Sequence, residues 1–380
     1  MLGGCLKKPL QTVDSTLPEP ETELGTLLPE TVLTSAAQST DPTPRARALS
    51  FLISTNGPDA QSWARVALED ADPWVQRAGV YALAERLPST EAKDLLEHFV
   101  GTDGDPYVRG AAGYRLASTE SVVAAERLAE AWRSERELWR IAPLALAAAE
   151  LGDTEAVPAL QQAIRRGELA LEIDFLKDLA GSGQAELLPA LREGADWVES
   201  ELRLPYAIAL VSLGDPSGEQ ALRKALGSSH VQECLEALDY VSELDHPTAN
   251  TLLRKARSNP SHHVRTYAAL ALAARTADGM DIFTEAMGDS DPEIRELAVR
   301  FAAQVAQNPN ASRKSMRSGS AVVSEALSDP NASVRSEAMK ATVTLGLHGQ
   351  NDALHRNLRD QYEALRIEAA GALLTLDSAP

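Results

Sequence analysis

The chain has 380 residues, of which 44% are hydrophobic, 24% charged and only 4% aromatic. Small aliphatic side chains must therefore supply the core, which favours closely packed helices over a sheet or a wide ligand cavity. The formal net charge of −19 gives a field that repels phosphate backbones, so we expect no nucleic-acid partner.

The first residues resemble a lipidation signal. Leu2-Gly3-Gly4-Cys5 is similar to the lipobox of bacterial lipoproteins, in which the cysteine thiol is acylated and becomes the mature N-terminus. The stretch from Lys7 to Pro44 is polar and rich in proline, so we expect it to stay disordered. The resemblance implies lipidation at Cys5, a tether over residues 1–41 and a lipid anchor in the bacterial cell envelope, periplasmic or at the outer membrane.

An alternative for this end remains open, since a full export signal also needs a charged segment and an apolar stretch before the cysteine. Only four residues precede Cys5, so the alternative is a short tail with an incidental cysteine. The other cysteine, Cys234, is expected to be a small core residue. Two cysteines support neither a disulfide framework nor a zinc site, and we expect no metal and no cofactor.

From residue 42 onward a repeat fills the chain. A pair made of an apolar residue and a following arginine recurs along the chain, and in a few repeats another residue stands at the second position of the pair. Consecutive second positions are 29–33 residues apart, except for one spacing of 40. The eleven second positions are Arg45, Gln76, Arg109, Arg140, Glu172, Arg203, Gln232, Arg265, Arg295, Arg335 and Arg366. A period in this range predicts a stack of equivalent supersecondary units.

Each unit is expected to be two helices. Asp291 suits an N-cap and Pro292 a first helical position, and Ile294, Ala298 and Phe301 then form one apolar stripe. The middle position of this stripe is Ala or Gly in seven units, which allows two helix axes to approach closely. The first helices end at turns such as Leu151-Gly152-Asp153, after which a second helix follows.

These features resemble the HEAT-like repeats of the phycocyanobilin-lyase group. Asp289–Arg295 reads Asp-x-Asp-Pro-x-Ile-Arg, and Asp70–Val75 and Asp103–Arg109 are close to the same pattern. The resemblance covers roughly residues 42–376. It implies an all-α fold, a right-handed α-solenoid of about eleven HEAT-like helical hairpins over residues 42–380, forming a long arc.

The resemblance also implies a ladder of ion pairs between successive repeats. It gives this structural role to Arg109, Arg265, Arg295 and Arg335. Repeats five and seven carry Glu172 and Gln232 instead of arginine, so we expect the ladder to weaken there.

Two sets of basic residues are candidate contacts for a partner. The second helices of the central repeats, expected to line the concave face, carry a basic stripe, although cations near helix C-termini also stabilise the helix dipole. The spacing of 40 predicts an inserted loop near residues 308–320 with three more cations, and a neutral surface loop is equally consistent with it. The candidates are Arg165, Arg166, Arg192, Arg223, Lys224, Arg254, Lys255, Arg257, Arg313, Lys314 and Arg317.

The sequence carries no recognisable catalytic motif. Di-iron hydroxylases built on similar repeats use His-Glu dipeptides, and none of the seven histidines here is followed by glutamate. We therefore expect a non-catalytic protein-binding scaffold, membrane-tethered through a lipidated Cys5, with a protein partner on the concave face. The alternative is a cytoplasmic bilin-lyase-like enzyme or enzyme-maturation factor.

Overall fold

The computed structural model describes residues 28–378 except 56, 103, 167–174, 176–177, 180 and 198–202. Every regular element in these residues is a helix, so the predicted all-α solenoid is confirmed. Cys5 and Glu172 lie outside the described residues. No helix within the described residues is long and apolar enough to cross a membrane.

The helices follow the predicted hairpins in the part of the chain that the structure describes, which leaves out most of residues 167–180 in repeat five. The first helices of the repeats are α2 (Pro42–Ser54), α4 (Pro73–Ala84), α6 (Pro106–Leu116), α8 (Leu138–Glu150), α12 (Arg203–Ser212), α14 (Val231–Glu243), α16 (His262–Thr276), α18 (Pro292–Gln307), α20 (Ala332–Thr344) and α22 (Glu363–Ser378). The helices on the other layer are α1 (Pro29–Ala36), α3 (Ala60–Leu68), α5 (Thr90–Val100), α7 (Val122–Ser134), α9 (Ala156–Arg165), α11 (Leu188–Trp197), α13 (Pro216–Leu226), α15 (Thr248–Ala256), α17 (Asp281–Met287), α19 (Arg313–Ala326) and α21 (Asn351–Asn357).

Local sequence explains where these helices begin and end. Asp291 caps α18 by accepting a hydrogen bond from the Glu293 N–H at 2.9 Å, and Pro292 follows it, as predicted. At the end of α8, Gly152 has φ +97° and the Asp153 N–H donates to the Ala148 carbonyl at 2.9 Å. This is the Schellman arrangement, in which a glycine in the left-handed region satisfies the last carbonyls of a helix.

The small residues at the middle of the apolar stripe set the distance between helices. Ala48, Ala298 and Ala338 are fully buried. At Gly79, a Cβ atom would lie 2.7 Å from the Cβ of Ala67 on the second helix of the preceding repeat. No side chain fits there without moving the two helices apart, which agrees with the close packing that the sequence predicts.

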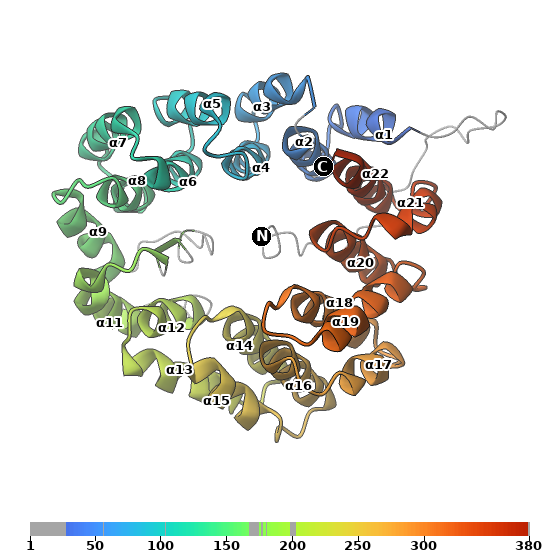
Figure 1. The fold of residues 1–380 in the computed structure, drawn as a ribbon. Coiled ribbons are helices and arrows are strands. Elements are labelled where there is room, and N and C mark those ends of the chain that lie inside the picture. The colour runs from blue at the N-terminus through green and yellow to red at the C-terminus, as the bar shows by residue number, and fades with distance from the viewer. Residues whose placement is uncertain are drawn as a thin grey trace.

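The solenoid closes on itself into a ring (Figure 1). The first helix of the eleventh repeat is α22, which closes the described part of the chain. The N-terminal helix α1 packs against α22 from the outside of the ring. The N-terminal α1 therefore completes the eleventh hairpin. The expected arc is thus closed into a ring. Within the expected tether of residues 1–41, residues 29–36 form a helix whose Leu33 and Ala36 are buried, and residues 1–27 lie outside the described residues.

The seam between the two ends of the chain is held by packing and by one buried ion pair. Arg47 of α2 and Glu368 of α22 are 3.2 Å apart, with side chains 14% and 4% exposed. The ring of Phe51 lies so close to Gly371 that a Cβ there would be 2.3 Å from its nearest carbon. The apolar clusters of α1, α2 and α22 are continuous, so the seam resembles the interior of the stack.

Candidate functional site

The concave face is built from the first helices of the repeats, not the second. In Figure 1 the first helices line the inside of the ring, while α3, α5, α7, α9, α11, α13, α15, α17 and α21 lie outside. The inner circumference is the shorter one, so helices on it must approach each other more closely. The first helices carry the alanine and glycine positions that permit this approach. We call the inward face of the first helices the inner wall.

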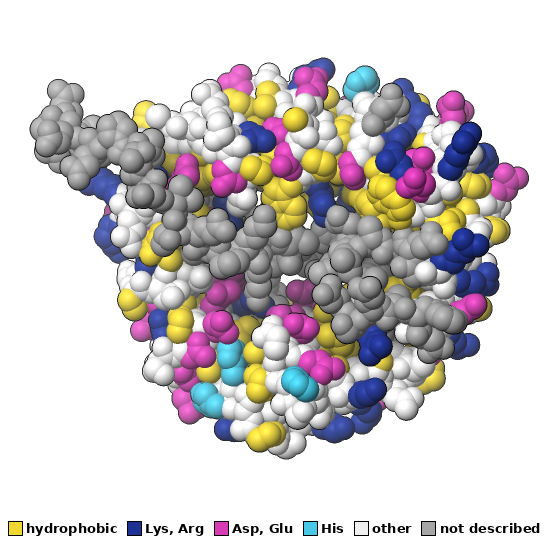
Figure 2. Space-filling view, turned by 180° about the vertical axis from the view of Figure 1, so that it is seen from behind, with side chains coloured by type: hydrophobic (Ala, Val, Ile, Leu, Met, Phe, Trp, Pro, Cys, Tyr) yellow, Lys and Arg dark blue, Asp and Glu magenta, His cyan; other side chains and the backbone are white. Residues whose placement is uncertain are grey.

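The predicted basic stripe therefore lies outside the ring, contrary to expectation. Arg165, Arg192 and Arg223 are on α9, α11 and α13, and Lys255 is on α15. Figure 2 shows Lys and Arg side chains along the right and lower edges of the molecule, the side of α9 to α15 when turned from Figure 1.

Three of these outer cations are paired within the chain. Arg165 lies 3.2 Å from Glu193, Arg192 pairs with Asp215, and Arg223 pairs with Glu219. Several others stand in the last turn of their helices, where a cation stabilises the helix dipole. The stripe is thus partly neutralised on the outer surface, although Lys224, Arg254, Lys255 and Arg257 are exposed.

Of the expected insertion at residues 308–320, only residues 308–312 form a turn and the rest is helical. Residues 313–326 form α19, and the repeat is longer because α18 and α19 have 16 and 14 residues. Arg313, Lys314 and Arg317 are exposed on the first turns of α19. The extra residues lengthen a hairpin that packs closely against its neighbours, so these cations sit on a helix surface.

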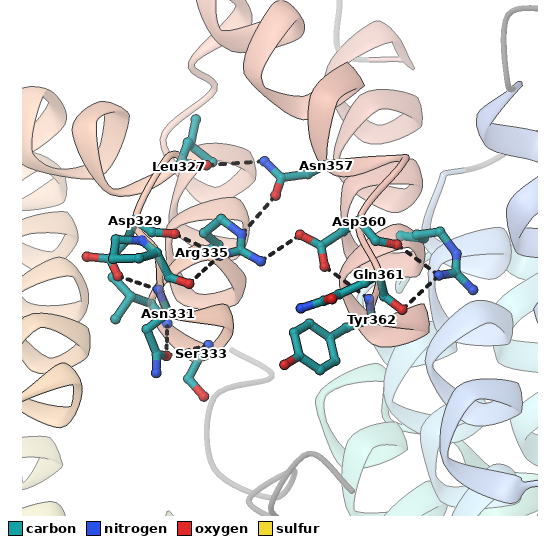
Figure 3. A network of polar contacts seen from close by, with 12 residues as sticks. Leu327, Asp329, Asn331, Ser333, Arg335, Asn357, Asp360, Gln361 and Tyr362 are labelled. Atoms are coloured by element: carbon teal, nitrogen blue, oxygen red, sulfur yellow. Dashed lines mark hydrogen bonds and ion pairs between the residues drawn. The ribbon is translucent and has the colours of Figure 1, made fainter. Parts of the chain in front are cut away.

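The predicted arginine ladder is present in part. Arg295 bonds the Asp329 carboxylate through two nitrogens, at 2.8 and 3.0 Å. Arg335 lies 2.6 Å from Asp360 and 3.2 Å from the Asn357 amide oxygen, as Figure 3 shows. In both cases the carboxylate belongs to the next repeat. A third pair, Arg45 with Asp70 at 2.8 Å, was not predicted as part of the ladder.

Arg265 departs from this pattern. Arg265 donates to the carbonyls of Asn259 and Pro260, while the Asp289 carboxylate of the next repeat bonds His262 at 2.9 Å. Arg109 donates from Nε to the Val100 carbonyl at 3.0 Å. Of the two positions at which the ladder was expected to weaken, Gln232 on α14 bonds Glu236 and Glu172 lies outside the described residues.

The inner wall carries a polar network that the sequence analysis missed. It consists of Asp239 on α14, Tyr267 on α16, Glu296 and Arg300 on α18, and Glu337 and Lys340 on α20. We call these six residues the inner-wall network. On α18, Glu296 and Arg300 lie on the face opposite the buried Ile294, Ala298 and Val305. That geometry directs them away from the outer helices.

Arg300 is the centre of the network. Its guanidinium is 3.5 Å from Asp239, 3.5 Å from Glu296 and 3.8 Å from Glu337. The Asp239 carboxylate belongs to α14, so the arginine reaches across the intervening α16. Between them, the Tyr267 hydroxyl donates to Asp239 at 2.6 Å. Arg300 and Tyr267 together thereby link four successive inner helices.

Burial and neighbouring charges fix the protonation states of Tyr267 and Arg300. Burial raises the pKa of Tyr267, and the nearby Asp239 carboxylate raises it further, so the phenol stays a neutral hydrogen-bond donor. Burial alone would lower the pKa of Arg300, but Tyr267, Glu337 and Asp239 raise it overall. The guanidinium is therefore a permanent charge surrounded by carboxylates.

The network continues into an acidic face on α14. Glu236, Asp239 and Glu243 fall at i, i+3 and i+7, on the face opposite the buried Cys234, Leu238 and Val241. Glu236 and Glu243 are exposed, and the Asp239 side chain is 43% exposed. Carboxylates outnumber cations here, so this part of the inner wall presents negative charge.

Cys234 lies in the core of the stack. Cys234 is buried, with its sulfur near the carbonyls of Ala225 and Ser228, and burial raises the pKa of its thiol. This agrees with the core role expected for it. The described part of the chain holds no cluster of three or more His, Cys, Asp or Glu side chains that could bind a metal ion.

Comparison with known proteins places the chain among helical-repeat proteins. Residues 30–117 match the family of HEAT repeats, and the repeats and their packing define a HEAT-like repeat protein, here closed into a ring. The comparison with curated proteins gives no match.

Several solved structures match the chain at low sequence identity and low TM-score. A mutant of Kap121p is 13% identical, with 90% of this chain and 44% of that one covered and a TM-score of 0.34. Human deoxyhypusine hydroxylase is 17% identical, covering 92% and 98%, with a TM-score of 0.28. The CpcE–CpcF complex of phycocyanin lyase from Nostoc sp. PCC7120 is 19% identical, covering 77% and 99%, with a TM-score of 0.37. This chain thus spans less than half the length of Kap121p.

Proposed function

We propose that the ring is a non-catalytic scaffold that binds a protein partner on its inner wall. The observation that supports this is the acidic face of α14 with the inner-wall network beside it. The network ties α14, α16, α18 and α20 together, so a partner meets a rigid surface and little ordering cost is added on binding.

The charge of this surface indicates the kind of partner. Glu236, Asp239 and Glu243 are at least partly exposed, and complementary charge steers association and selects the partner. The proposed partner segment is therefore basic. A basic concave face would instead have favoured an acidic partner. The basic residues lie on the outer helices, so that expectation does not apply to the inner wall.

A crosslinking experiment tests which surface binds. A photo-reactive amino acid replaces Glu236 on the inner wall or, as a control, Glu126, an exposed residue of α7 on the outside. We expect a protein adduct in the native cell from position 236 alone. In a separate affinity capture of the partner, with no photo-reactive residue in the chain, the double change Glu236→Lys and Glu243→Lys should prevent capture, and the matched change Glu126→Lys and Glu130→Lys should not. Adducts from position 126 alone, or capture unaffected by charge reversal on α14, would contradict the proposal.

The tether through Cys5 is the second part of the proposal. It rests on the lipobox-like Leu2-Gly3-Gly4-Cys5, and an envelope anchor would place the scaffold beside envelope proteins. The test is the mass of the N-terminal peptide from the native cell, with partitioning into detergent. A diacylglycerol adduct on Cys5 supports the anchor. An unmodified peptide starting at Met1 removes it and favours the cytoplasmic alternative, for which chromophore absorbance of the native protein is the next measurement.

A further inference from the structure

Two stretches of this acidic chain contain no carboxylate side chain. Residues 246–277 include no aspartate or glutamate, and neither do residues 220–232, although the formal net charge of the whole chain is −19. The first stretch holds all of α15 and α16, and the second holds the end of α13. Because α13 and α15 are neighbours in the outer layer, the two stretches give one part of the outer surface an excess of positive charge.

Four cations of α13 and α15 project from this surface. Lys224 is in the last turn of α13, Arg254 and Lys255 are in the last turn of α15, and Arg257 follows as its C-cap. All four are exposed, and none of them pairs with another residue in the described part of the chain. We call these four residues the outer basic patch. It belongs to the region where Figure 2 shows Lys and Arg side chains along the lower edge of the molecule.

Stabilisation of helix ends does not account for this much charge. The C-terminal end of a helix carries about half a negative charge, whereas α15 ends with three full positive charges at Arg254, Lys255 and Arg257. Arg265, at the start of α16, donates to the carbonyls of Asn259 and Pro260 in the turn after α15, so its charge adds to theirs. The excess charge therefore points to an anionic partner outside the chain.

We infer that the outer basic patch binds the headgroups of an anionic bilayer, an inference that rests on the tether through Cys5 proposed above. An acyl anchor and a polybasic patch together hold a protein on a membrane more firmly than either alone. The patch lies on the convex outside of the ring, a shape that suits a flat partner. The exposed Val231 in the turn after α13 adds an apolar side chain of the kind that enters the headgroup region.

This contact is compatible with a protein partner on the inner wall. The outer basic patch and the acidic face of α14 lie on different layers of the ring (Figure 1), so the bilayer and the partner do not compete for one surface. The tether enters the ring at α1, across from α13 and α15 in Figure 1. Contact at the patch therefore holds the ring at a second point and orients it on the bilayer.

Vesicle flotation tests the patch apart from the tether. The full chain carries Cys5→Ser, so that no lipid is attached, and the vesicles contain phosphatidylcholine alone or mixed with phosphatidylglycerol in equal amounts. We expect binding only to the anionic vesicles, and the binding should weaken as salt is added because ions screen exposed charges. No binding to the anionic vesicles at low salt, or equal binding to both kinds of vesicle, overturns the inference.

A triple variant locates the contact on the patch. Arg254→Gln, Lys255→Gln and Arg257→Gln together remove three cations, and each cation near an anionic surface contributes roughly fivefold to affinity. The apparent affinity for anionic vesicles should therefore fall about a hundredfold. The three side chains are exposed, so the variant should keep the melting temperature of the wild type, and the loss is then a loss of contact and not of fold.

The matched control removes the same residue types from the opposite end of a helix hairpin. Its changes are Arg313→Gln, Lys314→Gln and Arg317→Gln on α19, whose Ser315 hydroxyl donates to the Ala277 carbonyl beside Asp278. These cations have a carboxylate in the neighbouring turn, and most of the vesicle binding should persist without them. Equal losses in the two triple variants would show that only net charge matters, and would overturn the inference.

An acidic protein is the other macromolecule that fits a basic surface. Binding of a poly-glutamate peptide, with no binding to anionic vesicles, overturns the inference in favour of such a protein. If native Cys5 carries lipid while the vesicle test fails, the tether stands and the bilayer contact is wrong. If the vesicles bind while the native N-terminal peptide is unmodified, the tether is wrong and the bilayer contact stands.

Discussion

The ladder arginines have different hydrogen-bond partners in different repeats. Arg295 bonds the Asp329 carboxylate through two nitrogens, and the two side chains are 12% and 6% exposed. Arg265 occupies the same position in its repeat but donates to the carbonyls of Asn259 and Pro260, while the Asp289 carboxylate bonds His262. Removing Arg295 strands a buried charge, whereas removing Arg265 does not.

We therefore expect Arg295→Met to destabilise the protein by about 2 kcal/mol, somewhat less than the loss of one partner from a fully buried pair. Arg265→Met is the matched control and should cost clearly less. Thermal unfolding gives the overall change, and hydrogen exchange in α18 and α20 shows whether it is local. Equal losses in the two variants would mean that the carbonyl bonds, not the ion pair, carry the stabilisation.

The same pair makes stability depend on pH. Burial alone would raise the pKa of Asp329, but hydrogen bonds from the Arg295 side chain and the Asn331 backbone lower it overall. A carboxyl with a lowered pKa in the folded state contributes stability above its unfolded pKa, near pH 4, and loses it as the pH falls further. The melting temperature should therefore fall less steeply on the acid side of pH 4 for Asp329→Asn than for the wild type. Asp278→Asn, in the exposed turn after α16, should keep the wild-type slope.

At the seam, the packing of α2 against α22 depends on the absence of a side chain at Gly371. A Cβ at Gly371 would lie 2.3–2.5 Å from three ring carbons of Phe51, so Phe51 or the helix must move. We expect Gly371→Ala to cost about 1–3 kcal/mol, as overpacking of a core does. Gly57→Ala is the control, since nothing lies within 4 Å of a Cβ there. An unchanged melting temperature in Gly371→Ala would show that Phe51 and the two helices move apart without loss of stability.

The sequence predicts the helices well because each one depends on nearby residues. Asp291 and Pro292 begin α18, and Gly152 ends α8, and these signals act within a few positions of the chain. The inner-wall network could not be predicted this way, because Asp239 and Arg300 are brought together only by the curvature of the stack. Which helix layer lies inside could have been inferred from the alanine-rich first helices. The seam could not, since α1 has only eight residues and two buried side chains.

Closure changes what limits the stability of the whole molecule. In an open solenoid each repeat contacts only its neighbours, and the end repeats fray because they lack one neighbour. Here α1 covers α22, and Arg47 pairs with Glu368, so neither end is exposed. While α1 is in place, the seam should therefore not fray before the other repeats unfold.

Deleting α1 tests this directly. A chain lacking residues 1–37 loses Leu33 and Ala36 from the core and exposes the outer face of α22, so we expect the ring to open at the seam. A chain lacking only residues 1–27 keeps α1 and should stay closed. Spin labels on α3 and α21, the outer helices on either side of α1 in Figure 1, report the distance across the seam by pulsed electron resonance. A short, narrow distance distribution in both deletions would show that α2 and α22 hold the ring without α1, and α1 would then be a cover and not a closing element.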